Sequence, residues 1–300
     1  MELREWTMKA PWGTIALISY GNPDGEPVLL VHGRLDSAAT FIPLLKLLPT
    51  RFNYVLVDLP GNGKSDPFPK GTMLTRFLGV AVIDIVVKHL GWKEFTYIGH
   101  SLGAEHGLFY AAIYPKQVKR AIYLDPGPSI VFCYPLEFPR FFKDNYESFY
   151  DSYHKYDYDR EYTKEQAIRA VRNARSLNEA EAEIILSRCL VEIGPDTYKL
   201  SWDRRYKTLP GFNSLPAEFY LDLFSLHPTP SLFICSNSLK NLFYRPKSLA
   251  VSLMSTLTDK SRNVKVLYVD GSHDVHLTNP ERFINELLTF LETDFVVSKL

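Results

Sequence analysis

The stretch Phe95–Gly103, FTYIGHSLG, decides the fold. It begins with an apolar run at 95–98 that is typical of a buried strand, and it leads into a helical pattern over 102–114. Gly-x-Ser-x-Gly at 99–103 therefore places a serine on a sharp turn from strand to helix. Such a serine takes a strained backbone conformation, and the flanking glycines let the neighbouring chain pass without a clash. This context predicts Ser101 as a nucleophile, although a bare match more often marks an ordinary tight turn.

Similar apolar runs occur on both sides of this stretch. They span residues 28–31, 54–57, 121–124, 231–235 and 264–269, with further helical patterns at 40–48, 73–90 and 280–295. Strands that alternate with helices are typical of βαβ units. The sequence therefore predicts an α/β fold with a mostly parallel, twisted sheet flanked by helices. Residues 12–20 and the turn after them predict antiparallel strands at the sheet edge instead.

The composition changes after Asp125. Residues 128–163 hold twelve Phe or Tyr, and charged amphipathic helices are expected to open at Thr163 and Ser176. We therefore expect a core domain in two parts with a mainly helical cap inserted between them. The predicted boundaries are 1–126 and 229–297 for the core, 127–228 for the cap, and 298–300 for a terminal tripeptide.

Composition and charge exclude several classes of protein. The 34 Lys+Arg balance the 34 Asp+Glu, whereas a nucleic-acid-binding protein would normally show a basic excess. Cys133, Cys189 and Cys235 are too scattered for a disulfide framework or a zinc site, which fits a reducing compartment. We expect neither a signal peptide nor a membrane span, because the sequence lacks a long apolar stretch.

The last three residues, Ser298, Lys299 and Leu300, spell a peroxisomal import signal that acts at a carboxyl end. This tripeptide predicts the peroxisomal import receptor as a partner. The expected location is the peroxisome, with the cytoplasm as a second possibility.

A serine hydroxyl needs an imidazole to accept its proton. His273 follows the last predicted strand and so lies at the carboxyl edge of the sheet, where Ser101 also emerges. We interpret His276, three residues on, as a structural side chain. The same interpretation applies to His32, His100 and His106.

A carboxylate should hold the far nitrogen of that imidazole, usually in the turn after the penultimate strand. That turn, 236–240, reads SNSLK and contains neither Asp nor Glu. Asp125, at the end of the preceding strand, is our prediction for the acid. The alternative is an acid elsewhere, because an aspartate here can also simply cap a turn.

Two backbone N–H groups should face the negative charge that develops on the substrate oxygen. We predict that Leu102 and Arg34 donate them. The side chain of Arg34 is then free, and we expect it to pair with Asp36 rather than with an anionic group of a substrate. Glu105 is interpreted as a buried, hydrogen-bonded side chain.

No cofactor or metal is expected. Residues 61–65, GNGKS, lack the spacing of a phosphate-binding loop. A serine at the elbow also excludes enzymes that form an alkyl ester on a carboxylate at that position, such as haloalkane dehalogenases. Acyl transfer to water remains.

The chain resembles the α/β-hydrolase superfamily, whose motifs occur here in the family's order at 32–33, 58–65, 99–103 and 271–273. More narrowly it resembles the animal serine hydrolase-like (Kraken-like) proteins, on the residues at 11–13, 32–36 and 124–125 together with Asp203 and Arg205. The resemblance implies a peroxisomal or cytoplasmic hydrolase. Two features depart from the superfamily pattern: Asn62 stands where a histidine is common, and the acid after the penultimate strand is missing.

The expected function is hydrolysis of a carboxylic ester or thioester through an acyl-enzyme, with Ser101, His273 and Asp125 as the triad. The neutral chain favours a small, apolar, uncharged ester-like substrate. Two alternatives remain open at this stage. One is a ligand-binding or signalling protein on a hydrolase scaffold, and the other is a cofactor-free lyase or oxygenase.

Overall fold

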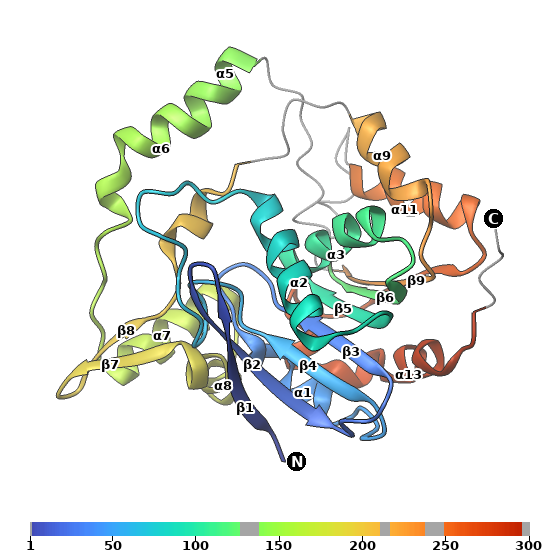
Figure 1. Cartoon of the computed structure of the whole chain (residues 1–300). Coiled ribbons are helices and arrows are strands. Elements are labelled where there is room, and N and C mark those ends of the chain that lie inside the picture. Colours follow the sequence, from blue (N-terminus) through green and yellow to red (C-terminus); the bar gives the residue numbers. More distant parts are fainter. Residues whose placement is uncertain (1, 127–137, 211–216, 238–248, 296–300) are drawn as a thin grey trace.

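The computed structural model describes residues 2–126, 138–210, 217–237 and 249–295 (Figure 1). Cys133, the turn residues 238–240 and the tripeptide Ser298–Leu300 lie outside these ranges. Cys189 and Cys235 are free and buried.

An eight-stranded sheet forms the centre of the molecule, in the order β1-β2-β4-β3-β5-β6-β9-β10. Its strands are β1 (Arg4–Ala10), β2 (Gly13–Gly21), β3 (Pro27–Val31), β4 (Asn53–Val57), β5 (Phe95–His100), β6 (Val118–Leu124), β9 (Ser231–Ser236) and β10 (Val264–Val269). β1 and β2 pair antiparallel, as do β2 and β4, and every later neighbour pairs parallel. The predicted α/β class and the mostly parallel sheet are confirmed.

Helices cover both faces of the sheet (Figure 1). One buried apolar cluster joins the sheet to α2 (Arg76–Leu90), α3 (Leu102–Ile113), α9 (Ala217–Ser225) and α11 (Leu249–Lys260). A second cluster, on the other face, includes α1 (Ile42–Leu45), α12 (Val275–Thr278) and α13 (Ile284–Glu292). Because the central strands are buried on both faces, they read as continuous apolar runs rather than alternating ones.

Several helices are shorter than their sequence patterns. The pattern at 40–48 forms a 3₁₀ turn, Ala38–Phe41, followed by α1, and Ser37 caps the turn by accepting from the N–H of Ala39. The pattern at 280–295 divides likewise into a 3₁₀ turn, Pro280–Arg282, and α13. In both places a proline enters the first helical turn, where its missing N–H does no harm.

The chain between β6 and β9 is partly helical and partly a hairpin. Its described elements are α5 (Phe138–Phe142), a π-helical turn (Lys143–Glu147), α6 (Ser148–Asp151), a 3₁₀ turn (Tyr153–Lys155), α7 (Lys164–Arg175), α8 (Glu179–Cys189), β7 (Leu190–Gly194), β8 (Thr197–Leu200), a 3₁₀ turn (Arg204–Thr208) and α9. In Figure 1, α5 and α6 stand away from the sheet. The hairpin β7–β8 is a finding beyond the helices expected from the sequence.

Thr163 caps α7 through the predicted capping box. The expected start at Ser176 is wrong, because Ser176 ends α7 in a left-handed conformation with φ 55°. The cap of α8 is Asn178, whose side chain accepts from the N–H of Glu181. This Asn-to-Glu box, two residues later than the predicted one, satisfies the N–H groups of Asn178 and Glu181.

Two arginines attach this segment to the core. Arg205 binds Asp203 and donates to the carbonyls of Phe68, Pro69 and Thr72 at 2.7–2.8 Å. Asp203 and Arg205, two of the residues on which the family resemblance rests, thus hold this segment against the loop before α2. Arg188 of α8 binds the buried Asp58, with Nη2 2.7 Å from Oδ2.

Among the described helices, none is both long and apolar enough to cross a membrane.

Candidate active site

Ser101 lies at the junction of β5 and α3 with φ 50° and ψ −113°, a conformation that L-residues rarely adopt. The flanking glycines are required by close packing. A Cβ on Gly103 would lie 2.1 Å from the carbonyl oxygen of Val31, and one on Gly99 would lie 2.6 Å from that of Gly103. The elbow therefore fixes Ser101 at the carboxyl edge of the sheet, where it is 8% exposed.

The structure brings His273 and Asp125 together. Nδ1 of His273 lies 2.6 Å from Oδ2 of Asp125, although the two residues follow different strands, β10 and β6. His276 faces another way, since its Nε2 lies 2.9 Å from Oγ1 of Thr40. Of the two histidines weighed from the sequence, His273 is the one that meets a carboxylate.

Asp125 is fully buried and is held from the neighbouring strand. Oδ1 accepts from the backbone N–H of Ser236 at 2.8 Å, and Oδ2 accepts from the Ser236 hydroxyl at 2.9 Å. Ser236 ends β9, which is where the superfamily pattern leads one to look for the acid. The carboxylate that contacts His273 thus follows β6, one strand of the sheet before β9, and Ser236 at the end of β9 holds it in place.

The loop after β3 is fixed by His32. The N–H of Leu59 donates to Nε2 of His32 at 2.9 Å, so Nδ1 must carry the proton that it donates to the Gly33 carbonyl at 2.7 Å. In a trans peptide the carbonyl and the N–H point in opposite directions. Because the Gly33 carbonyl turns toward His32, the N–H of Arg34 turns away from His32.

A cavity of about 740 Å³ opens over these groups. Ser101, His273, Arg34 and Leu102 all line it, and its volume suits a small-molecule ligand. Much of the remaining wall is apolar and comes from the segment between β6 and β9: Tyr162, Ala170, Val171, Ala174, Leu200, Trp202 and Leu209. The four predicted site residues at the pocket and the buried Asp125 behind His273 therefore form one continuous site.

Arg175, at the end of α7, binds two carboxylates beside this pocket. Its Nη2 lies 2.9 Å from Oδ2 of Asp36, and Nε lies 3.0 Å from Oδ2 of Asp274. Burial works against the charged form of Asp274, but the hydrogen bond and charge of Arg175 hold its pKa below the ordinary value. Asp274 follows His273 directly, so Arg175 anchors the loop that carries the imidazole.

This arrangement corrects one expectation. Asp36 pairs with Arg175, so the local pair between Arg34 and Asp36 expected from the sequence is wrong. Arg175 gave no signal in the sequence, because an arginine in the last turn of a helix is commonplace.

Two buried histidines lie behind His273. Burial and the neighbouring imidazoles lower the pKa of His100 far below its usual value, and burial lowers that of His276 to about 4. Ligand atoms of Asp36, His100 and His276 lie within 4.8 Å of one another. The Arg175 guanidinium bound to Asp36 opposes a cation there. We interpret these histidines as neutral packing residues, as the sequence indicated.

Glu105 and His106 in α3 are also buried. Burial raises the pKa of Glu105 to about 7, against the opposing charge of Arg76, whose Nη1 lies 2.5 Å from Glu105 Oε2. Burial lowers the pKa of His106 to about 3. Asn62, the departure from the superfamily pattern, is buried and donates to the Pro60 carbonyl at 3.2 Å.

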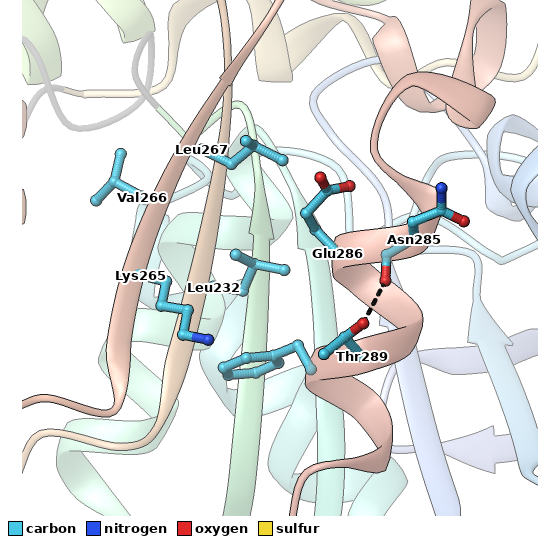
Figure 2. A pocket seen from close by; sticks show the side chains of 8 residues that line it. Leu232, Lys265, Val266, Leu267, Asn285, Glu286 and Thr289 are labelled. Carbon is cyan, nitrogen blue, oxygen red and sulfur yellow. Dashed lines mark hydrogen bonds between the residues drawn. The ribbon is translucent and has the colours of Figure 1, made fainter.

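A second cavity, of about 280 Å³, lies between β10 and α13 (Figure 2). Aliphatic side chains form part of its wall, together with the polar residues Lys265, Asn285 and Glu286. The hydroxyl of Thr289 donates to the Asn285 carbonyl at 2.8 Å. None of its lining residues is a histidine, cysteine or serine. This cavity therefore offers no serine, thiol or imidazole for nucleophilic or acid–base chemistry.

Comparison with known families agrees with the resemblance to α/β hydrolases seen in the sequence. A family model described as alpha/beta hydrolase fold matches residues 26–280. Among named relatives, the serine hydrolase-like protein of Danio rerio is 29% identical over 295 residues, covering 96% of this chain and 88% of that protein. A probable serine hydrolase of Drosophila melanogaster is 26% identical over 302 residues, covering 96% and 87%. The resemblance to animal serine hydrolase-like proteins is confirmed.

Solved structures share the fold. A thioesterase domain from the curacin biosynthetic pathway superposes with a TM-score of 0.77 at 22% identity, covering 96% of this chain and 100% of that one. The carboxylesterase CesB of Bacillus subtilis superposes with a TM-score of 0.64 at 19% identity, covering 98% and 93%.

Proposed function

The chain belongs to the alpha/beta hydrolase fold family, and on that basis we propose that it is a serine hydrolase that cleaves a carboxylic ester or thioester through an acyl-enzyme. The observation that carries the proposal is the 2.6 Å contact between His273 and the buried Asp125 beside the pocket of Ser101. The names of the relatives and of the two solved structures agree with it.

In the first half of the reaction, Oγ of Ser101 attacks the carbonyl carbon while Nε2 of His273 accepts its proton. The carbonyl oxygen becomes an oxyanion, which the N–H groups of Arg34 and Leu102 bind. Asp125 keeps the proton of His273 on Nδ1, so that Nε2 is free to act. The intermediate then collapses: the bond to the alcohol or thiol breaks, and His273 returns the proton to that leaving group.

In the second half, a water molecule gives its proton to His273 and attacks the acyl carbon. The bond to Ser101 breaks, the serine regains its proton, and a carboxylic acid leaves. The net reaction consumes one ester and one water and requires no cofactor. Removing one oxyanion donor typically slows such reactions by about 10²–10³-fold.

The test is turnover of para-nitrophenyl butyrate and of a matching acyl thioester by wild type and by Ser101→Ala. Ser101→Ala should lose about 10⁶-fold in kcat, because the triad acts as a unit. Ser187→Ala, an exposed serine on α8, is the matched control and should keep full activity. Equal turnover by Ser101→Ala contradicts the mechanism. A folded wild type that binds esters without cleaving them indicates instead a binding protein on the same scaffold.

A further inference from the structure

Four cationic side chains line the Ser101 pocket: Arg34, Arg76, Arg175 and Lys207. They come from four separate parts of the chain: the loop after β3, α2, α7 and the 3₁₀ turn at 204–208. The two carboxylates on the same wall are Asp36 and Asp274. The wall therefore carries more positive than negative groups, although the chain as a whole is neutral.

Two of these cations already have partners. Arg175 binds both Asp36 and Asp274. Arg76 binds the buried Glu105 and donates to the Pro210 carbonyl at 2.7 Å. Both carboxylates of the wall are thus taken up, and neither is left to neutralise a further cation.

The side chains of Arg34 and Lys207 make no hydrogen bond or ion pair with any residue in the ranges that the structure describes. Arg34 lies close enough to Arg76 to feel its charge: partial burial, and then the positive charge of Arg76, lower the pKa of Arg34. A bound anion would relieve both effects, since it supplies the opposite charge that the wall lacks.

The position of Arg34 matters for the reaction. Its loop touches the nucleophile, because a Cβ on Gly33 would lie 3.1 Å from Cβ of Ser101. The backbone of Arg34 is the proposed oxyanion donor, so its side chain starts from the residue that would bind the scissile carbonyl. Because Arg34 and Ser101 line the same pocket, one molecule can reach both the guanidinium and the nucleophile.

We propose that Arg34, assisted by Lys207, binds an anionic group of the substrate, so that the natural substrate is an ester or thioester that carries a carboxylate or phosphate. A guanidinium suits both groups, because its two parallel N–H donors match their paired oxygens. The apolar walls from α7 and β8 would contact the rest of the molecule. This proposal rests on the proposed function and replaces the uncharged ester expected from net charge alone.

The experiment compares esters that differ in one charge. One pair carries the charge in the acyl part: the mono-para-nitrophenyl ester of adipic acid and its terminal primary amide. The other pair carries it in the alcohol part: the acetate esters of para-hydroxybenzoate and para-hydroxybenzamide. A phosphonate in place of each carboxylate distinguishes the two kinds of anion. In at least one pair, wild type should favour the anion by about 10- to 100-fold in kcat/KM, the range of charge-assisted hydrogen bonds.

Arg34→Gln keeps the backbone N–H but removes the charge, so the ratio of anionic to neutral kcat/KM should fall at least about tenfold, whatever happens to each rate. Arg34→Lys should retain an intermediate ratio. Arg169→Gln, which removes an exposed arginine on α7, should leave the ratio unchanged. Because the anion site is partly exposed, the wild-type ratio should shrink as salt is added.

A second readout needs no turnover. Ser101→Ala should bind the monoethyl ester of adipic acid at least about tenfold more tightly than the corresponding amide, measured by calorimetry. No preference in either ester pair and none in binding overturns the proposal, as does a preference that survives Arg34→Gln. Absence of turnover combined with preferential binding refutes the hydrolase but supports the anion site, so the two failures are distinguishable.

Discussion

Replacing Asp125 by Asn tests the unusual place of the acid. The structure fixes how the new amide must lie, because the backbone N–H of Ser236 points at Oδ1 and needs an acceptor there. The amide oxygen therefore takes the Oδ1 position, and the NH₂ takes the Oδ2 position. There it faces Nδ1 of His273, 2.6 Å away in the native protein.

An amide NH₂ can only donate, so it makes Nδ1 an acceptor and moves the imidazole proton to Nε2. A histidine protonated at Nε2 cannot accept the proton of Ser101. In a triad this loss costs about 10⁴-fold in kcat, or about 5 kcal/mol of transition-state stabilisation. The fold should survive, because the Ser236 hydroxyl can accept from the new NH₂.

The assay is kcat for para-nitrophenyl butyrate, together with thermal unfolding to confirm that the variant is folded. Ser236→Ala is the matched control: it removes the hydroxyl that donates to Asp125 but keeps the carboxylate and the backbone N–H, so it should cost about 100-fold or less. A folded Asp125→Asn variant with wild-type kcat refutes the reasoning and places the acid elsewhere.

Three further outcomes are expected. Arg175→Met leaves two buried carboxylates unpaired and should lower the free energy of unfolding in urea by about 3 kcal/mol. Arg172→Met, which removes an exposed arginine on the same helix, should change it by about 0.5 kcal/mol or less. Equal effects of the two variants contradict the role of the ion pairs. Burial raises the pKa of Glu105 to about 7, so this group stabilises the folded state more at about pH 5 than at about pH 7. Glu105→Gln lacks this gain, and its free energy of unfolding should therefore fall by about 2 kcal/mol more than that of wild type between about pH 7 and about pH 5. Parallel curves of the free energy of unfolding against pH refute this. In a tagged chain that ends at Leu300, deleting that residue should disperse peroxisomal fluorescence into the cytosol, and persistent puncta contradict the import signal.

Much of the fold was predictable because the central strands are covered on both faces. Residues 28–31, 54–57 and 121–124 read as unbroken apolar runs, and each lies in a strand of the sheet. Ser101 was predictable because its strained turn needs glycines at fixed positions on either side. Such local requirements leave a direct trace in the sequence.

Contacts between distant segments left no comparable trace. Arg175 meets Asp36 and Asp274 across 139 and 99 positions, and only the tertiary fold, in which α7 packs against α8 and Leu277, brings them together. The support of Asp125 by Ser236 spans 111 positions in the same way. The expected pair of Arg34 with Asp36 was wrong, because the arginine that contacts the buried Asp36 is Arg175, which is far from it in the sequence.

The most direct test of the central claim is to map the residue that a fluorophosphonate probe modifies. Wild type should gain one phosphonyl group, and tandem mass spectrometry should place it on the peptide that contains Ser101. Butyrate ester added in excess should slow the labelling, because ester and probe compete for the same hydroxyl. Modification of another residue, or ester hydrolysis that continues after Ser101 is fully labelled, would contradict the assignment of Ser101 as the nucleophile.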